Sequence, residues 1–180
     1  PDIILWNASF FAKPALDGKK TPWHQDGQYW AMRPLETCTV WIAVDAATTE
    51  NGCMRFLPGT HKDKNLRPHR THGNSKFTIR QELLESEYDE SKAYDVVLDE
   101  GQISLHDVYL LHGSEANYSS FPRRALTLRY MPATSVFDRN YARELYERSG
   151  VFDNSESTIF LMSGVNQAPD NDFRIRSKKI

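Results

Sequence analysis

The sequence predicts an all-β protein of the sandwich or barrel class. Short apolar and β-branched segments recur along the chain, and Gly, Pro, Asn or Asp bounds each of them. The pairs Asn51-Gly52 and Pro58-Gly59 supply residues that tolerate tight turns. Helical periodicity is scarce, and a chain of 180 residues has the length of one domain. We therefore expect residues 1–180 to form a single domain of many short strands.

The predicted strands follow from these segments. They cover residues 3–12, 24–32, 38–44, 53–57, 76–79, 93–98, 102–105, 108–111 and 124–131. Two helices are expected, a short one over residues 81–87 and a longer one over residues 139–148, in which Tyr141, Ala142, Leu145 and Tyr146 recur at helical spacing for one buried face. Residues 61–75, HKDKNLRPHRTHGNS, are polar and are expected to form a long surface loop that could cap a site.

Charge and cysteine content narrow the class of partner. The net charge is −2 and the Lys and Arg residues are scattered, which argues against a nucleic-acid or membrane surface and favours a small-molecule substrate. Cys38 and Cys53 are too few for a disulfide framework, so a reducing, cytoplasmic location is expected. No run reaches the roughly 20 apolar residues of a membrane span.

The chain starts at Pro1 with a strand pattern almost at once, which suggests that N-terminal structure is missing. The oligomeric state is not predicted.

The stretch WHQDGQYW raises the question of a metal site. Side chains two residues apart on a strand share a face, so His24 and Asp26 could present two ligands to one ion. A third ligand must come from elsewhere, and His112, after the predicted strand 108–111 and before Gly113, is the best supplier. Two histidines and one carboxylate form the ligand set of non-haem Fe(II) oxygenases.

The other histidines receive structural interpretations. His106 is the rival third ligand, but we expect a half-buried side chain with a hydrogen-bond partner. His61 is expected to fix the conformation of the polar loop, and His69 and His72 to be solvated.

Three ordered blocks carry a resemblance to a known family. KPALDGKKTPWHQDGQYW, TVWIAVDAATTENGCMRFLPGTHK and GQISLHDVYLLHGSEANYSSFPRRALTLRY resemble the phytanoyl-CoA dioxygenase family of Fe(II)- and 2-oxoglutarate-dependent oxygenases over roughly residues 3–132. The resemblance implies a cupin-like double-stranded β-helix, or jelly roll, with a few peripheral helices and with iron at the open end of the barrel. It implies His24, Asp26 and His112 as iron ligands and Arg123, eleven residues after His112, as the partner of the far carboxylate of 2-oxoglutarate.

Strand alternation gives an independent view of that arginine. Arg123, Ala125, Thr127 and Arg129 share a polar face, whereas Arg124, Leu126, Leu128 and Tyr130 would pack in a core. A buried dicarboxylate calls for a planar, bidentate cation, which arginine offers. The alternation favours Arg123, and one of the two arginines is expected to be solvated.

Further positions match the family near the same pocket. The resemblance places Ser114, Trp41 and Lys13 around the cosubstrate, although Ser114 could form only a local turn and Trp41 could be core. Lys19 and Lys20 lie in the same loop as Lys13, and any of the three could be solvated. Gln28, Tyr29 and Trp30 follow the first two ligands and could line the substrate side or pack in the core.

The implied activity is hydroxylation of an unactivated C–H bond with O2, with release of succinate and CO2. Halogenating relatives carry Gly or Ala in place of the carboxylate, so Asp26 favours a hydroxylase. Two alternatives remain: a cupin-type metal oxygenase that needs no cosubstrate, and a catalytically silent jelly-roll binding domain.

Overall fold

Two antiparallel sheets form a double-stranded β-helix in the computed structural model, which describes residues 1–71, 73, 76–150 and 153–176. The larger sheet has the order β13 (Phe160–Ser163), β1 (Ile3–Lys13), β11 (Arg123–Pro132), β4 (Cys38–Ala43) and β9 (Ile103–Asp107). The smaller sheet has the order β2 (Thr21–His24), β10 (His112–Ser114), β5 (Met54–Phe56) and β8 (Tyr94–Val96). The predicted jelly roll is confirmed.

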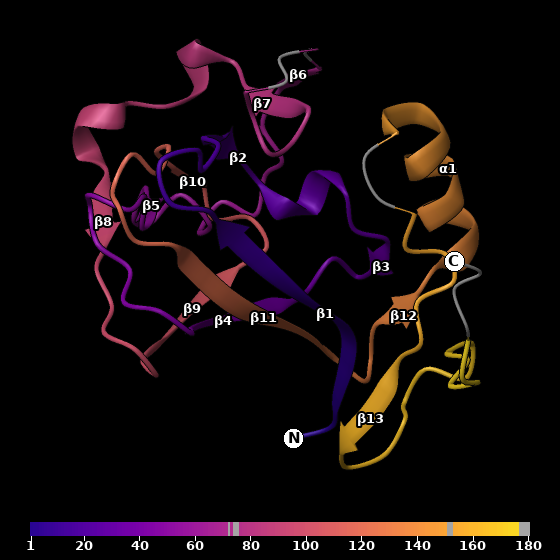
Figure 1. The fold of residues 1–180 in the computed structure, drawn as a ribbon. Coiled ribbons are helices and arrows are strands. Elements are labelled where there is room, and N and C mark those ends of the chain that lie inside the picture. The colour runs from indigo at the N-terminus through magenta and orange to yellow at the C-terminus, as the bar shows by residue number, and fades with distance from the viewer. Residues whose placement is uncertain (72, 74–75, 151–152, 177–180) are drawn as a thin grey trace.

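Short elements surround the two sheets. Two small sheets pair β12 (Val136–Phe137) with β3 (Met32–Arg33) and β6 (His69–Thr71) with β7 (Gln81–Leu83). The helices are α1 (Arg139–Ser149) and the 3-10 helices η1 (Asp26–Gln28), η2 (Glu85–Glu87) and η3 (Glu90–Lys92). Figure 1 shows α1, β12 and β13 on one side of the molecule and β8 on the opposite side. Within the described residues, no helix is long and apolar enough to cross a membrane.

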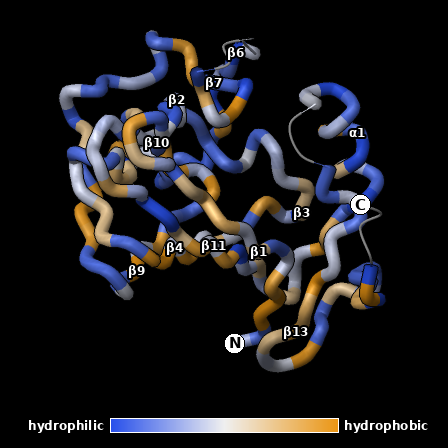
Figure 2. Tube along the Cα trace, in the orientation of Figure 1, coloured by the Kyte–Doolittle hydropathy of each residue, from blue (hydrophilic) through white to orange (hydrophobic). Residues whose placement is uncertain are grey.

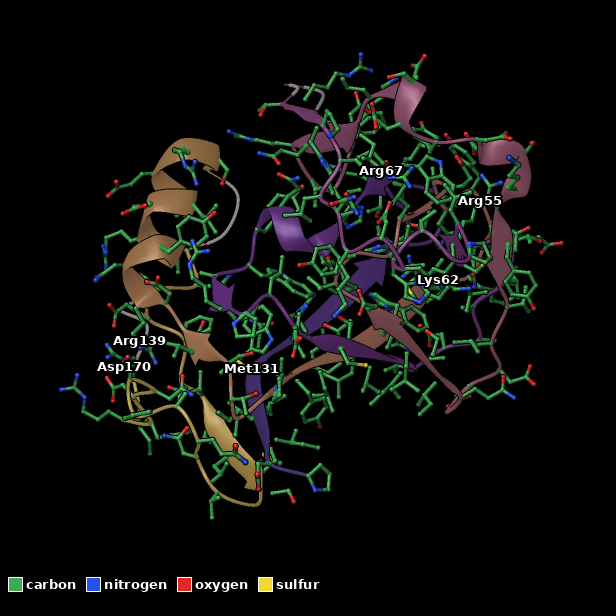
Figure 3. The ribbon with its side chains drawn as sticks, turned by 180° about the vertical axis from the view of Figure 1, so that it is seen from behind. Arg55, Lys62, Arg67, Met131, Arg139 and Asp170 are labelled. Carbon is green, nitrogen blue, oxygen red and sulfur yellow. The ribbon has the colours of Figure 1, made fainter. Side chains whose placement is uncertain are left out.

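The aromatic core lies where β1 and β11 meet the connection after β2. Trp6 contacts Trp30 edge to face at 4.9 Å between ring centroids and stacks on Phe137 at 5.7 Å. Ile4 and Met131 complete the same buried cluster. Figure 2 shows apolar residues along β1, β4 and β11, whereas α1 is mostly hydrophilic. Figure 3 labels Met131 and Arg139 on the α1 side and Arg55 and Arg67 on the opposite side.

Most predicted strands are present, but three predictions are wrong. Strand β2 ends at His24, and the 3-10 helix η1 begins at Asp26, so residues 24–32 are not one strand. Residues 76–79 form a turn and bends, with a bridge from Phe77 to Lys20 in place of a strand. Residues 108–111 form a turn that Asp107 fixes. The carboxylate of Asp107 accepts a hydrogen bond from the amide of Tyr109 (2.8 Å), and its backbone carbonyl accepts one from the amide of Leu110 (3.0 Å).

The helix predictions hold in part. The helix over residues 139–148 is confirmed as α1, which begins after the N-cap Asp138 and ends at Gly150 with φ of 63°. Of its four predicted core residues, only Ala142 is buried. Over residues 81–87, only the last three residues are helical, and the first three form β7. The polar loop 61–75 also contains β6.

Candidate metal centre and its cavity

Strand pairing brings the two predicted histidine ligands together. In the smaller sheet His112 at the start of β10 lies opposite His24 at the end of β2. The Nδ1 atom of His24 donates to the carbonyl of Pro22 and that of His112 to the carbonyl of Leu110, each at 2.9 Å. Because these bonds occupy Nδ1, both imidazoles present Nε2 to the interior, as metal-binding histidines commonly do.

Asp26 completes the cluster from the first residue of η1. Its Oδ1 atom lies 3.6 Å from Nε2 of His24 and 3.9 Å from Nε2 of His112. One ligand atom from each of the three residues lies within 4.8 Å of the others, and all three side chains are buried. The predicted grouping of the three residues is therefore present, although the turn after β2, and not a shared strand face, brings Asp26 to His24.

His106 belongs to the same site, which corrects the prediction of a half-buried position. It lies on β9 of the larger sheet, is 5% exposed, and places Nε2 3.6 Å from Oδ2 of Asp26. Its Nδ1 atom has no hydrogen-bond partner among the described residues. The two oxygens of Asp26 thus face different partners: Oδ1 faces the two predicted ligands, and Oδ2 faces His106.

His69 is not solvated, so that prediction is wrong. Its Nε2 atom accepts a hydrogen bond from the amide of Gln25 (3.1 Å), and its Nδ1 atom donates to the carbonyl of Arg67 (2.7 Å). Burial lowers the pKa of His69 to about 4, so this side chain stays neutral near His24, Asp26 and His112. His61 is partly buried, and its role stays a prediction. His72 lies outside the described residues.

The electrostatics of the cluster suit a metal ion. Burial alone would raise the pKa of the Asp26 carboxyl, but the nearby imidazoles of His106, His112 and His24 hold that pKa well below its usual range. Burial, together with His24, lowers the pKa of His112. An anionic carboxylate and a neutral imidazole are the protonation states in which these side chains bind metals.

A cavity of about 370 Å³ extends from this cluster. Arg123, Trp41 and Ser114 line one part of it. The Arg123 side chain is 3% exposed, lies 5.4 Å over the Trp41 ring, and leaves Nε without a partner among the described residues. Arg124 instead points outward and makes a two-point contact with Asp45, at 2.8 and 2.6 Å.

The alternation of β11 therefore places Arg123 inside and Arg124 outside, as expected. The opposite face is not a core, however, since Leu126, Leu128 and Tyr130 are only partly buried.

The structure separates the remaining predicted residues into two groups. Tyr29 and Trp30 line the cavity, and Trp30 also packs in the core against Trp6. Gln28 does not line it, and its side chain donates to the carbonyl of Arg67 at 3.3 Å. Lys13 is buried but also lies outside the lining residues.

The Lys13 amine is occupied by backbone carbonyls. It donates to Lys19 at 2.6 Å, to Ser114 at 3.5 Å and to Glu115. Burial, helped by Arg123, lowers its pKa to about 7. Lys20 forms an ion pair with Glu115 at 3.0 Å. Lys13 therefore holds the segment after β10 in place.

Sequence reasoning missed Gln25, which is fully buried. Its Nε2 atom donates to the carbonyls of Asn65 (2.8 Å) and Tyr109 (2.7 Å), and its Oε1 atom accepts from the amide of Arg67 (2.8 Å). These bonds tie the polar loop and the turn before His112 to the segment that carries Asp26. No local sequence signal could reveal partners so far along the chain.

Comparisons with known proteins show which family this chain resembles. The family model for phytanoyl-CoA dioxygenase matches residues 3–125. A phytanoyl-CoA dioxygenase domain-containing protein 1 homolog from Caenorhabditis elegans is 36% identical over 78% of this chain and 51% of its own length. The peroxisomal phytanoyl-CoA dioxygenase of Homo sapiens is 33% identical over 74% of this chain and 40% of its own length. The chain thus spans about half or less of the length of these relatives.

Solved structures show the same fold. A non-heme monooxygenase, ThoJ in its apo form, aligns with a TM-score of 0.71 and 25% identity over 99% of this chain and 58% of its own. EvdO2 from Micromonospora carbonacea var. aurantiaca, complexed with 2-oxoglutarate, aligns with a TM-score of 0.57 and 31% identity over 69% of this chain and 52% of its own.

Proposed function

Because the chain belongs to the phytanoyl-CoA dioxygenase family, we propose that the protein is an Fe(II)- and 2-oxoglutarate-dependent dioxygenase that hydroxylates a C–H bond of a small molecule, releasing succinate and CO2. The buried cluster of His24, Asp26 and His112, inside a jelly roll, carries this proposal. Iron and 2-oxoglutarate, when bound, supply the activation of O2 and the oxidising power.

The proposed iron ligands are Nε2 of His24, Nε2 of His112 and a carboxylate oxygen of Asp26. Their chemistry fits Fe(II), since two imidazoles and one carboxylate on one face leave coordination positions for a chelating cosubstrate and for O2. The backbone carbonyls that accept from both Nδ1 atoms orient the rings toward the cluster. The carboxylate of Asp26 fills the position that halogenating relatives leave open, which supports hydroxylation.

We assign the far carboxylate of 2-oxoglutarate to Arg123. This guanidinium is buried, lines the cavity and has no carboxylate within 4.0 Å among the described residues, so a dicarboxylate would satisfy it. Trp41 and Ser114 lie beside it in the same cavity. Lys13 would act on the cosubstrate indirectly, by fixing the backbone of Ser114 and Glu115.

The rest of the cavity would take the substrate. Tyr29 and Trp30 lie on its wall next to Asp26, where they would exclude water from the reacting centre. Gln28 would contribute only through its contact with the polar loop. A single domain and a cytoplasmic location stay predictions; the latter rests on the two free cysteines, Cys38 and Cys53.

The test is the weak visible charge-transfer band that Fe(II) and 2-oxoglutarate produce when they chelate without O2. We expect the band in the wild-type protein, its loss in His112→Ala, and its retention in the control His61→Ala, whose side chain lies outside the cavity. Absence of the band from the wild type, or its survival in His112→Ala, would falsify the proposal.

The same assay separates the alternatives. A metal oxygenase without cosubstrate would bind Fe(II), but 2-oxoglutarate would add no band. A silent binding domain would release no succinate with any substrate. Succinate release across a panel of small molecules is the second measurement.

A further inference from the structure

A row of polar side chains crosses the larger sheet beside the metal cluster. Arg129 of β11 lies opposite Asn7 of β1 on one side and opposite Thr39 of β4 on the other. Thr39 in turn lies opposite His106 of β9, whose Nε2 atom approaches Asp26. All four residues of the row line the cavity: Asn7, Arg129, Thr39 and His106. The polar row therefore runs across the cavity wall and ends at His106, beside the proposed iron ligand Asp26.

A bulge in β1 creates this row. The register of β1 against β11 shifts between Leu5 and Asn7, so Trp6 is an extra residue in β1. The bulge lets Trp6 stay in the core and Asn7 still face Arg129. Bulges of this kind re-aim side chains and are frequent beside active sites.

Arg129 is a buried cation held in a fixed position. It is 8% exposed, and its Nη1 atom donates to Oδ1 of Asn7 at 2.7 Å and to Oγ of Ser9 at 2.9 Å. Its guanidinium also lies 5.2 Å from the centroid of the Trp30 ring and 5.5 Å from that of the Phe11 ring. These contacts orient the guanidinium of Arg129, but none of them brings an anion to its positive charge.

The buried guanidinium of Arg129 lacks an anionic partner among the described residues. Among the described residues, no carboxylate oxygen lies within 4.0 Å of the Arg129 guanidinium, and its Nε atom has no hydrogen-bond acceptor. A buried charge without a counter-charge is costly, so such an arginine usually awaits a ligand. Arg123 is in the same condition, and the proposed function assigns it to 2-oxoglutarate. Among the described residues, two acidic residues line the cavity, Asp26 and Asp153. The charge of Asp26 acts on Arg129, but the proposed iron takes that charge.

Two neutral polar atoms of the cavity wall also lack a partner among the described residues. The hydroxyls of Thr39 and Tyr29 are buried, line the cavity and have no partner among the described residues. Unpaired buried hydroxyls are rare in folded proteins because their desolvation is not repaid. The guanidinium of Arg129 and the hydroxyl of Thr39, which lies opposite it on β4, are together complementary to an oxyanion.

We propose that Arg129, with Thr39 and Asn7, forms a second anion subsite that binds the carboxylate or phosphorus oxyanion of the substrate. This inference rests on the proposed function, because it assigns Arg123 to the cosubstrate. Arg129 lies six positions after Arg123 on β11, a backbone separation of roughly 20 Å, so we assign the two arginines to different anions. Trp30, Phe11 and Ile79 on the cavity wall would contact the apolar part of the substrate, next to the metal. The substrate is thus a compact organic anion.

The test uses three probes of similar size: hexanoate, butylphosphonate and neutral hexan-1-ol. Calorimetric titration is run on protein loaded with redox-inert Mn(II) and 2-oxoglutarate, and on metal-free protein. We expect the two anions to bind the wild type at least about tenfold more tightly than Arg129→Gln, while hexan-1-ol binds both proteins alike. Comparison of the two anions tells a carboxylate site from a phosphonate site.

Control variants separate this subsite from its neighbours. Arg124→Gln removes a cation from the exposed face of the same strand and should leave anion binding unchanged. Thr39→Val removes only a hydroxyl, keeps the side-chain shape, and should weaken anion binding about threefold. It guards against a folding defect in Arg129→Gln, which thermal melting of both variants also monitors.

Two results would overturn the proposal. One is anion binding that is unchanged in both Arg129→Gln and Thr39→Val. The other is loss of the 2-oxoglutarate charge-transfer band in Arg129→Gln but not in Arg123→Gln, which would assign Arg129 to the cosubstrate. If the wild type shows no band but binds anions through Arg129, the proposed function fails and the anion subsite stands.

Discussion

Consecutive residues of β11 illustrate how burial decides the role of a side chain. Arg123 and Arg124 have the same charge and length, but the first lies in the cavity beside Trp41 and the second bonds Asp45 at the surface. An exposed ion pair contributes little to stability, whereas a buried guanidinium keeps its capacity to bind an anion.

We predict opposite results for the two arginines. Arg123→Gln should raise the KM for 2-oxoglutarate at least about tenfold, because the distal carboxylate loses a bidentate cation. Arg124→Gln should leave that KM unchanged and lower the free energy of unfolding by no more than about 1 kcal/mol. Initial rates of succinate formation at varied 2-oxoglutarate measure both. Equal effects of the two substitutions would contradict the assignment.

Lys13 should make stability depend on pH in an unusual direction. Its pKa falls from 10.5 to about 7 on folding, so between these values the unfolded chain binds more protons than the folded one. Stability therefore rises with pH in this window, by roughly 2–3 kcal/mol between pH 7 and pH 9.

Substitution of Lys13 isolates this contribution. Lys13→Met should remove the rise, which is measured as the difference between the two proteins in urea unfolding at several pH values. Burial raises the pKa of Cys53 to about 11, but both proteins carry this thiol, so its ionisation in the unfolded chain cancels in the difference. A wild-type profile parallel to that of Lys13→Met would exclude the role of Lys13.

Sequence reasoning was most reliable for single residues whose spacing has a direct physical meaning. The alternation of RRALTLR placed Arg123 inside and Arg124 outside because a strand does obey a period of two. The same rule was applied to His24 and Asp26, where the strand had already ended. The side chains of His24, Asp26 and His112 still converge, since the tight turn of η1 brings Asp26 back toward the two histidines.

At the scale of elements, local hydrogen bonds override apolar patterns. The apolar pattern of residues 108–111 predicts a strand. Asp107 fixes a turn there instead, by accepting hydrogen bonds from the backbone amides of Tyr109 and Leu110. That signal was present in the sequence as an acidic residue before an apolar run. The contacts of Gln25 with the polar loop had no such signal, because they join segments that only the folded chain brings together.

The side chain of Gln25 should contribute as much to the free energy of unfolding as several ordinary hydrogen bonds. Gln25→Leu keeps the volume but leaves the amide of Arg67 and the carbonyls of Asn65 and Tyr109 without their partners. We expect a loss of about 2–4 kcal/mol in the free energy of unfolding. We also expect roughly tenfold weaker metal binding, since the segments of Asp26 and His112 are no longer tied.

Gln28→Leu is the matched control. Gln28 makes one bond of 3.3 Å to the same loop, so its loss should cost less than about 1 kcal/mol and leave metal affinity unchanged. Urea unfolding and calorimetric titration with Mn(II) measure the two variants. Equal behaviour of Gln25→Leu and Gln28→Leu would show that the loop is held by other contacts.

For the whole molecule, the cluster of His24, Asp26 and His112 connects distant parts of the chain. Its histidines lie on adjacent strands of the smaller sheet, Asp26 lies in the connection toward β3, and His106 reaches Asp26 from the larger sheet. Without a cation, the buried carboxylate of Asp26 is balanced mainly by its histidine neighbours. An ion bound here would therefore stabilise both sheets at once.

We accordingly expect metal to raise the melting temperature of the entire domain in one transition. Metal at a hundred times its Kd adds about 2.7 kcal/mol to a folded state that alone binds it. For a chain of 180 residues this corresponds to roughly 5–10 °C. Differential scanning calorimetry with Mn(II), and with EDTA as the metal-free reference, measures the shift. Asp26→Ala should abolish it, whereas the exposed Glu50→Gln should keep it. A shift that persists in Asp26→Ala would place the stabilising metal elsewhere on the molecule.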